Sequence, residues 1–201
     1  MMNIYGIPRP HVLGSIDYIQ LFQWLWLTFG LLILAGFISS GYFKMYYYTV
    51  LRYRSYRNWY FHYYIKIMLL WLVYCLALFL LGNTKEKNFW GAWGLLSIHL
   101  FFILSIFVLV VLLSQSIVFT TVFLFLFQGI GYIVTQKMGV SDERNPLVWG
   151  MICRSTIYEN SSSFDYIFVI IVQCFFILFL GGLGYFKVKD ILRNNYKMFL
   201  G

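Results

Sequence analysis

The chain has 201 residues, of which 61% are hydrophobic and only 11% charged, and its formal net charge is +8. Globular chains usually carry roughly 45–50% apolar and about 25% charged residues, so this composition excludes a water-soluble enzyme. It also excludes the polar, highly charged type of disordered chain. Lipid is therefore the expected solvent for most of the side chains.

The amino-terminal segment Met1–Tyr18 is short and mildly polar. A cleaved secretory signal needs a basic start, an apolar run and a small-residue cleavage site. Neither that pattern nor an Arg/Ser-rich transit peptide precedes the first long apolar run. We therefore expect a protein that inserts without a cleaved address, or that is made in the compartment where it resides.

Four apolar windows follow in chain order, and about 18 apolar residues are enough for a helix to cross ~30 Å of hydrocarbon. They are Ile19–Gly41, Ile67–Gly82, Ala92–Thr135 and Tyr166–Phe186. The second window extends to Ile65 if Lys66 reaches up to the membrane surface. The third has 44 residues and no charge. As one helix it would measure ~66 Å, twice the bilayer core. The polar triplet 114–116 divides it into two full spans, which predicts a tight helical hairpin there.

The distribution of charge tests the resulting five spans, at about 19–41, 65–82, 92–113, 117–135 and 166–186. Five spans place the basic loop 42–64 and the carboxyl tail on one side, with nine basic residues and one acidic residue. The other side then has six of each. With four spans the basic residues divide eight to seven, without the usual excess on the inner side. The sequence therefore predicts an all-α polytopic membrane protein with one membrane domain, its amino terminus outside and its carboxyl terminus inside.

The outer loop 136–165 is the largest connection outside the membrane. Its apolar residues Leu147, Val148, Trp149 and Ile152 are expected to lie on the membrane surface. The three cysteines are too few and too scattered for a disulfide framework.

Ionisable residues inside spans are the first candidates for function, because their burial is costly. Here the only titratable side chain at depth is His99, which argues against proton translocation by this chain alone. His62 lies ~20 Å away in depth, too far for the two to ligate one haem iron. We expect His99 to hydrogen-bond a neighbouring helix, alongside Ser97 and Gln128.

No spacing typical of a metal centre, a nucleophile elbow or a phosphate-binding loop is present. The sequence therefore predicts no catalytic residues, no cofactor and no metal site. Small residues in the spans are expected to permit close helix contacts, although none forms a GxxxG motif. They are Gly30, Ala35, Gly36, Gly129, Gly131, Gly181, Gly182 and Gly184.

The segment 42–64 interleaves basic residues with tyrosines. Such a mixture can stack on nucleic-acid bases, but beside a span on the inner face it is typical of an aromatic belt with an anionic-lipid site. Docking of a soluble partner is a third interpretation. We expect lipid, with cardiolipin as the ligand, and no nucleic acid. The predicted lipid-binding residues are Lys44, Arg52, Arg54, Arg57, Trp59 and Lys66.

The composition also carries a resemblance. The chain has 21 Phe and 17 Tyr, but alanine only at positions 35, 77 and 92. In this it resembles divergent, mitochondrially encoded respiratory-chain subunits of protists. The five-span count is similar to that of subunit 6 of NADH:ubiquinone oxidoreductase, although the Gly-rich third span of that subunit is not recognisable in Ala92–Leu113. The resemblance implies an accessory subunit of complex I or cytochrome oxidase in the mitochondrial inner membrane, with other membrane subunits as partners.

Two other classes stay open. A small polytopic transporter or export component in the inner membrane of an AT-rich bacterium would need a polar path, for which the candidates are Thr120, Thr121, Gln128 and His99. A membrane enzyme acting on lipid would need interfacial His, Asp or Glu clusters, and the outer side offers only scattered acids.

Overall fold

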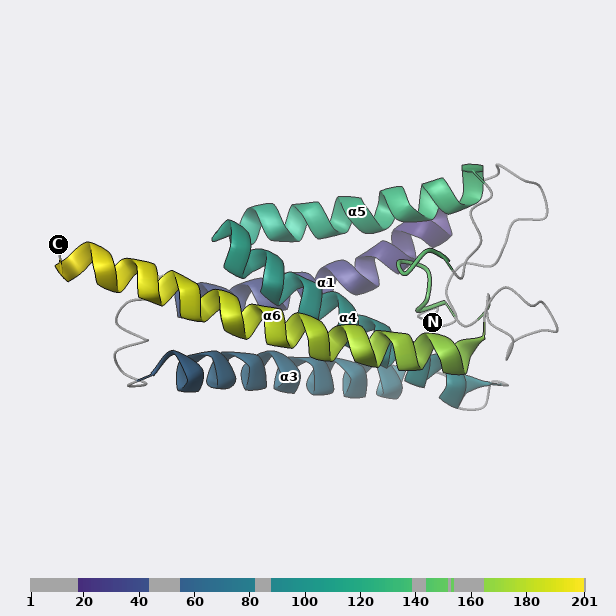
Figure 1. The fold of residues 1–201 in the computed structure, drawn as a ribbon. Coiled ribbons are helices and arrows are strands. Elements are labelled where there is room, and N and C mark those ends of the chain that lie inside the picture. Colours follow the sequence, from purple (N-terminus) through teal and green to yellow (C-terminus); the bar gives the residue numbers. More distant parts are fainter. Residues whose placement is uncertain are drawn as a thin grey trace.

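The computed structural model describes residues 18–43, 55–81, 88–138, 144–151, 153 and 165–200, with the backbone alone for residues 136, 138 and 188–200. Within these residues the regular elements are all helices and no strand occurs, so the predicted fold class is confirmed. The helices form one elongated bundle (Figure 1). They are α1 (Tyr18–Phe43), α3 (Tyr56–Leu81), α4 (Phe89–Ser114), α5 (Ile117–Met138) and α6 (Tyr166–Leu200).

Each of the five helices contains a stretch long and apolar enough to cross a membrane. Two helix boundaries differ from the predicted spans by more than one helical turn. Helix α3 begins at Tyr56 rather than at residue 65, because Ser55 caps it: the Ser55 Oγ accepts the Asn58 N–H at 3.1 Å. Helix α6 runs past residue 186 to Leu200. The predicted inner loop 42–64 was therefore too long, since residues 56–64 form the first turns of α3.

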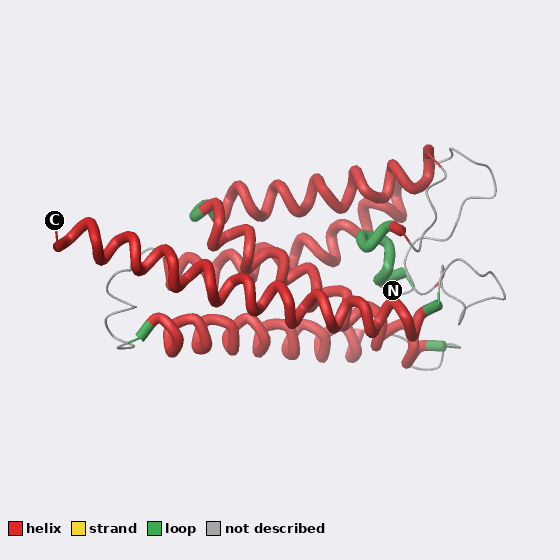
Figure 2. The backbone as a smooth tube through the Cα atoms, in the orientation of Figure 1, coloured by secondary structure: helices red, strands yellow, loops and turns green. Residues whose placement is uncertain are grey.

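The hairpin predicted at residues 114–116 is confirmed, and the polar triplet caps both of its helices. Gln115 adopts the left-handed conformation with φ 54° and donates its N–H to Val111 O at 2.8 Å, as at many helix C-termini. The Ser114 Oγ accepts the Ser116 N–H at 3.2 Å. The Ser116 Oγ accepts the Phe119 N–H at 3.3 Å. Only two residues separate α4 from α5 (Figure 2).

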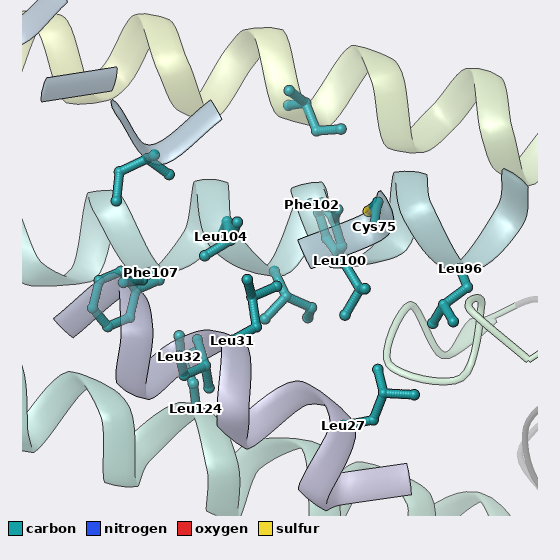
Figure 3. Packing of buried hydrophobic residues seen from close by; sticks show 14 of the residues in the cluster. Leu27, Leu31, Leu32, Cys75, Leu96, Leu100, Phe102, Leu104, Phe107 and Leu124 are labelled. Carbon is teal, nitrogen blue, oxygen red and sulfur yellow. The ribbon is translucent and has the colours of Figure 1, made fainter. Parts of the chain in front are cut away.

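Helix α4 is the centre of the bundle, because it packs against each of the other four helices. In its 18-residue apolar stretch 72% of the residues are buried, against 17% in α3 and 22% each in α5 and α6. Leucines of α1 and α5 and Cys75 of α3 converge on Leu100, Leu104 and Phe107 of α4 (Figure 3). Helices α3, α5 and α6 thus turn most of their surface away from the core, whereas half of the apolar stretch of α1 is buried.

Aromatic donors hold α3 to its neighbours. The Trp71 indole donates to Ser97 O of α4 at 2.7 Å, and the Trp93 indole of α4 donates back to Cys75 O at 3.1 Å. The Tyr74 hydroxyl donates to Leu27 O of α1 at 2.6 Å. Each acceptor is a helical carbonyl, whose second lone pair takes the additional bond. Three helices are joined in this way.

Glycines make room for these rings. The position of a Cβ at Gly30 lies 3.4 Å from the Tyr74 hydroxyl oxygen, and that at Gly184 only 2.6 Å from the Tyr60 hydroxyl oxygen. The Tyr60 hydroxyl in turn donates to Gly181 O of α6 at 2.7 Å. The predicted close contacts therefore occur, but at these positions a glycine admits a tyrosine side chain rather than a second backbone.

We predict that Gly184→Ala destabilises the bundle by about 1–3 kcal/mol, because the new methyl displaces the Tyr60 ring and strains its bond to Gly181 O. Gly182→Ala is the matched control, since a Cβ there meets nothing within 4 Å, and alanine is the better helix former. Unfolding in detergent mixtures followed by circular dichroism measures both. Equal stability of the two variants would contradict the tyrosine-in-glycine packing.

Candidate functional site

His99 lies in the middle of the bundle, completely buried on α4. It is the tenth residue after the start of α4 at Phe89, hence ~15 Å from that end of the bundle. This end is called the outer end, and the opposite end the inner end, after the orientation that the charge distribution predicts. The rings of Trp24 and Phe102 flank it, each with its centroid 6.3 Å from that of the imidazole. The surroundings of the imidazole are therefore largely aromatic.

One hydrogen bond holds the His99 ring, and it comes from another helix as predicted, although the partner is Gln173 of α6. The Gln173 Nε2 lies 3.3 Å from His99 Nδ1. If the amide donates, the ring proton is on Nε2. The Nε2 atom of His99 and the Oε1 atom of the equally buried Gln173 have no hydrogen-bond partner within the described part of the chain.

Residues 144–151, here called the outer strap, form a short loop against the helices at the end of the bundle opposite the carboxyl terminus, drawn in green (Figure 2). Asn145 anchors the strap to α5: its Nδ2 donates to Gly131 O at 2.8 Å and also to the Thr135 Oγ1. Its Oδ1 accepts the Leu147 N–H at 3.0 Å, which closes an Asx turn. Gly150 then lies against the imidazole, because a Cβ there would be 2.5 Å from His99 Cδ2.

The strap corrects one sequence expectation. Leu147, Val148 and Trp149 are buried against the helices, not spread on the membrane surface, while Ile152 lies outside the described residues. Either arrangement removes apolar side chains from water, so composition alone does not distinguish them. The notch at Gly131 that receives Leu147 was not visible in the sequence, because it exists only once α5 and the strap are side by side.

The remaining polar residues in the spans fall into two groups. Hydroxyls bond back to carbonyls of their own helices, as Thr120 does to Ser116 O at 2.8 Å and Thr121 to Ile117 O at 2.9 Å. Gln128 is different: it is 3% exposed, and both its Oε1 and its Nε2 lack a partner among the described residues. Gln128 is therefore not joined to His99, and Ser97 bonds to Trp93 O instead.

The inner end of the bundle is built from aromatic rings. Trp59 stacks on Tyr63 with centroids 5.8 Å apart and meets Phe43 edge to face at 5.9 Å. The Tyr63 hydroxyl and the Ser39 Oγ share a 2.8 Å hydrogen bond that joins α3 to α1. Trp59 is completely buried. The sequence prediction had assumed that this ring lies at the surface where lipid headgroups bind. The ring instead lies inside the protein and packs against the other aromatic rings of this end.

Two of the other predicted lipid-binding residues are described. Arg57 and Lys66 are exposed on α3. The Lys66 ammonium lies 5.0 Å above the Tyr42 ring, a cation–π geometry that holds its charge beside the aromatic cluster. Lys44, Arg52 and Arg54 lie outside the described residues.

Comparisons with models of known protein families, with curated proteins and with solved structures found no match.

We predict that Gly131→Ala releases the outer strap, because a methyl group there overlaps the Leu147 side chain, with its Cβ and Cγ both 3.2 Å away. The backbone amides of Val148 and Met151, which bond within the strap, should exchange with deuterium roughly 5- to 150-fold faster, as an overpacking cost of about 1–3 kcal/mol implies.

Gly129→Ala is the control for this experiment, since its new Cβ would be 3.6 Å from Leu25 Cδ1, an ordinary contact. Exchange monitored by mass spectrometry in detergent micelles compares the two variants. If both variants or neither accelerate exchange in the strap, the docking of Leu147 at Gly131 does not hold the strap in place.

Proposed function

We propose that the chain is a non-catalytic integral subunit of a respiratory-chain complex, complex I or cytochrome oxidase, in the mitochondrial inner membrane. The observation that carries the proposal is that polar side chains form hydrogen bonds between helices. Donors such as Trp71, Trp93 and Tyr74 bond to carbonyls of other helices, so they join helices instead of lining a path. A bundle tied together in this way is suited to a structural role.

The outward surface supports association with other membrane subunits. On α5 the rings of Phe119, Phe123 and Phe127 stack in a row, with centroids 5.8 and 5.7 Å apart and planes within 14° of each other. All three are exposed. Phe175 and Phe179 repeat the arrangement on α6. Rigid aromatic rows present large contact areas at little cost in side-chain entropy.

The assignment to a respiratory complex rests on the compositional resemblance, and the orientation on charge. The basic excess lies on the side of residues 42–64 and the carboxyl tail, which the positive-inside rule assigns to the matrix. The amino terminus then faces the intermembrane space.

We predict that photo-reactive benzoylphenylalanine at Phe123 or Phe179 crosslinks to other membrane subunits of one respiratory complex, because both side chains face outward. The control position is Phe107 of α4, which is completely buried and should give only intramolecular products. Native electrophoresis after gentle extraction, followed by mass spectrometry, identifies the adducts. Migration as a free monomer, without subunit adducts, would contradict the proposal.

Anionic lipid, cardiolipin in this membrane, is the proposed ligand of the inner basic side. Arg57 and Lys66 are exposed there on one helix. Each basic residue near an anionic leaflet contributes ~1 kcal/mol. The site would strengthen contacts between this chain and its neighbours.

We predict that Arg57→Gln lowers the amount of copurifying cardiolipin, with an affinity loss of roughly fivefold, as ~1 kcal/mol implies. Lys137→Gln is the control, because Lys137 is equally charged and exposed but lies in the last turn of α5 at the outer end. Native mass spectrometry of the lipid-bound protein measures both. Equal lipid retention by the two variants would favour protein docking as the role of the basic segment.

A small transporter is the second candidate, and the observation that favours it is the group of buried polar atoms at His99, Gln128 and Gln173. A polar path would also have to cross the inner half, where the hydroxyls of Thr120 and Thr121 bond to carbonyls of their own helix. The crosslinking experiment separates the two candidates, since a transporter needs no respiratory partner.

A further inference from the structure

Buried polar atoms that lack a partner among the described residues occur at two neighbouring depths of the bundle. They are His99 Nε2, Gln173 Oε1, and both Oε1 and Nε2 of Gln128. These three side chains come from α4, α6 and α5, and none is more than 3% exposed. In a bundle surrounded by hydrocarbon such atoms are costly, because no bulk solvent replaces the missing hydrogen bonds.

The depths of His99 and Gln128 in the bundle follow from their distances to the turn between α4 and α5. Gln128 is 11 residues from the start of α5 at Ile117, and His99 is 15 residues from the end of α4 at Ser114. Since the two helices are antiparallel arms of a tight turn, Gln128 lies about one helical turn, ~6 Å, deeper from the outer side. Gln173, bonded to His99, shares its depth. The unpaired atoms therefore lie at two depths that are about one helical turn apart.

We propose that the outer half of the bundle binds ordered water molecules, at the His99–Gln173 pair and, one turn deeper, at Gln128. Both kinds of hydrogen-bonding group are left over. With the Gln173 amide donating to Nδ1, the pair leaves the His99 Nε2–H and the second amide N–H as donors and the Gln173 Oε1 as acceptor. With the amide turned over and the imidazole tautomer exchanged, donors and an acceptor are again left.

Water is the ligand that best fits these unpaired donors and acceptors. The amide of Gln128 adds a further donor group and acceptor. Each position therefore requires a ligand that both donates and accepts hydrogen bonds. An anion would find no cation, and a metal cation no cluster of ligands, among the described residues around these atoms. Neutral, bifunctional water satisfies every unpaired atom without bringing a charge into the membrane interior.

The outer strap separates these positions from the outer aqueous phase. Gly150 lies directly against the His99 ring, and Val148 and Met151 on either side of it are completely buried. Exchange of the bound water with the outer side therefore requires the strap to move.

Radiolytic labelling tests the proposal on the intact protein. A short X-ray pulse splits bound water into hydroxyl radicals, which oxidise the side chains around it, and mass spectrometry locates the products. We expect Phe102 and Trp24, whose rings flank His99 and are 5% and 3% exposed, to be oxidised severalfold faster than other buried rings. The matched controls are Phe107, also on α4, and Trp59 in the inner aromatic cluster, both 0% exposed.

The second arm uses Gln128→Leu, an apolar replacement of similar shape. If Gln128 holds water, the variant loses those bonds and should melt at a lower temperature than the wild type. If Gln128 is dry, removal of two unpaired atoms should raise the melting temperature, which would overturn the deeper site. Labelling of Phe102 and Trp24 no faster than that of Phe107 and Trp59 would overturn the site at His99.

Discussion

The requirement that each polar group find a partner inside the protein shapes this bundle more than any other constraint. Lipid offers neither donors nor acceptors, and the chain has only three alanines with which to bring backbones together. It uses indole and phenol donors instead. Trp71 and Trp93 each donate to a carbonyl on the helix of the other. Because a carbonyl already bonded within its helix still accepts a second proton, helices can be joined without opening their own ladders.

The glycines complete this arrangement. In membrane bundles glycine usually lets two backbones approach closely, but Gly181 and Gly184 of α6 lie one turn apart and face Tyr64 and Tyr60 of α3, which are also one turn apart. Each tyrosine ring thus occupies the space above a glycine. A helix rich in large residues can then pack closely while placing its hydroxyls on the partner backbone, as Tyr60 does on Gly181 O.

The sequence was sufficient for the fold class, the five spans and the hairpin, because hydrophobic length and charge asymmetry are properties of single segments. It was sufficient to predict that His99 bonds to another helix but not to name the partner, since Gln128 and Gln173 are equally plausible until the rotation of each helix is known. It did not predict the burial of Trp59, because a tryptophan at a membrane interface packs as well against protein as against headgroups. The docking of Leu147 at Gly131 brings together residues that are 16 positions apart in the sequence. No local sequence pattern predicts such a contact.

The two ends of the bundle differ because of how many polar atoms each buried side chain carries. A hydroxyl is satisfied by one carbonyl of its own helix, as in Ser39 bonded to Ala35 O and Ser105 bonded to Phe101 O, and it still accepts a bond from a tyrosine. An imidazole or a carboxamide has two polar atoms that point apart, so one interhelical bond leaves the other atom unpaired. That is the situation of His99 and Gln173. The half of the bundle that contains such side chains is also the half closed by the outer strap. The packing of the strap against Gly131 therefore determines how well the polar interior is separated from the outer aqueous phase.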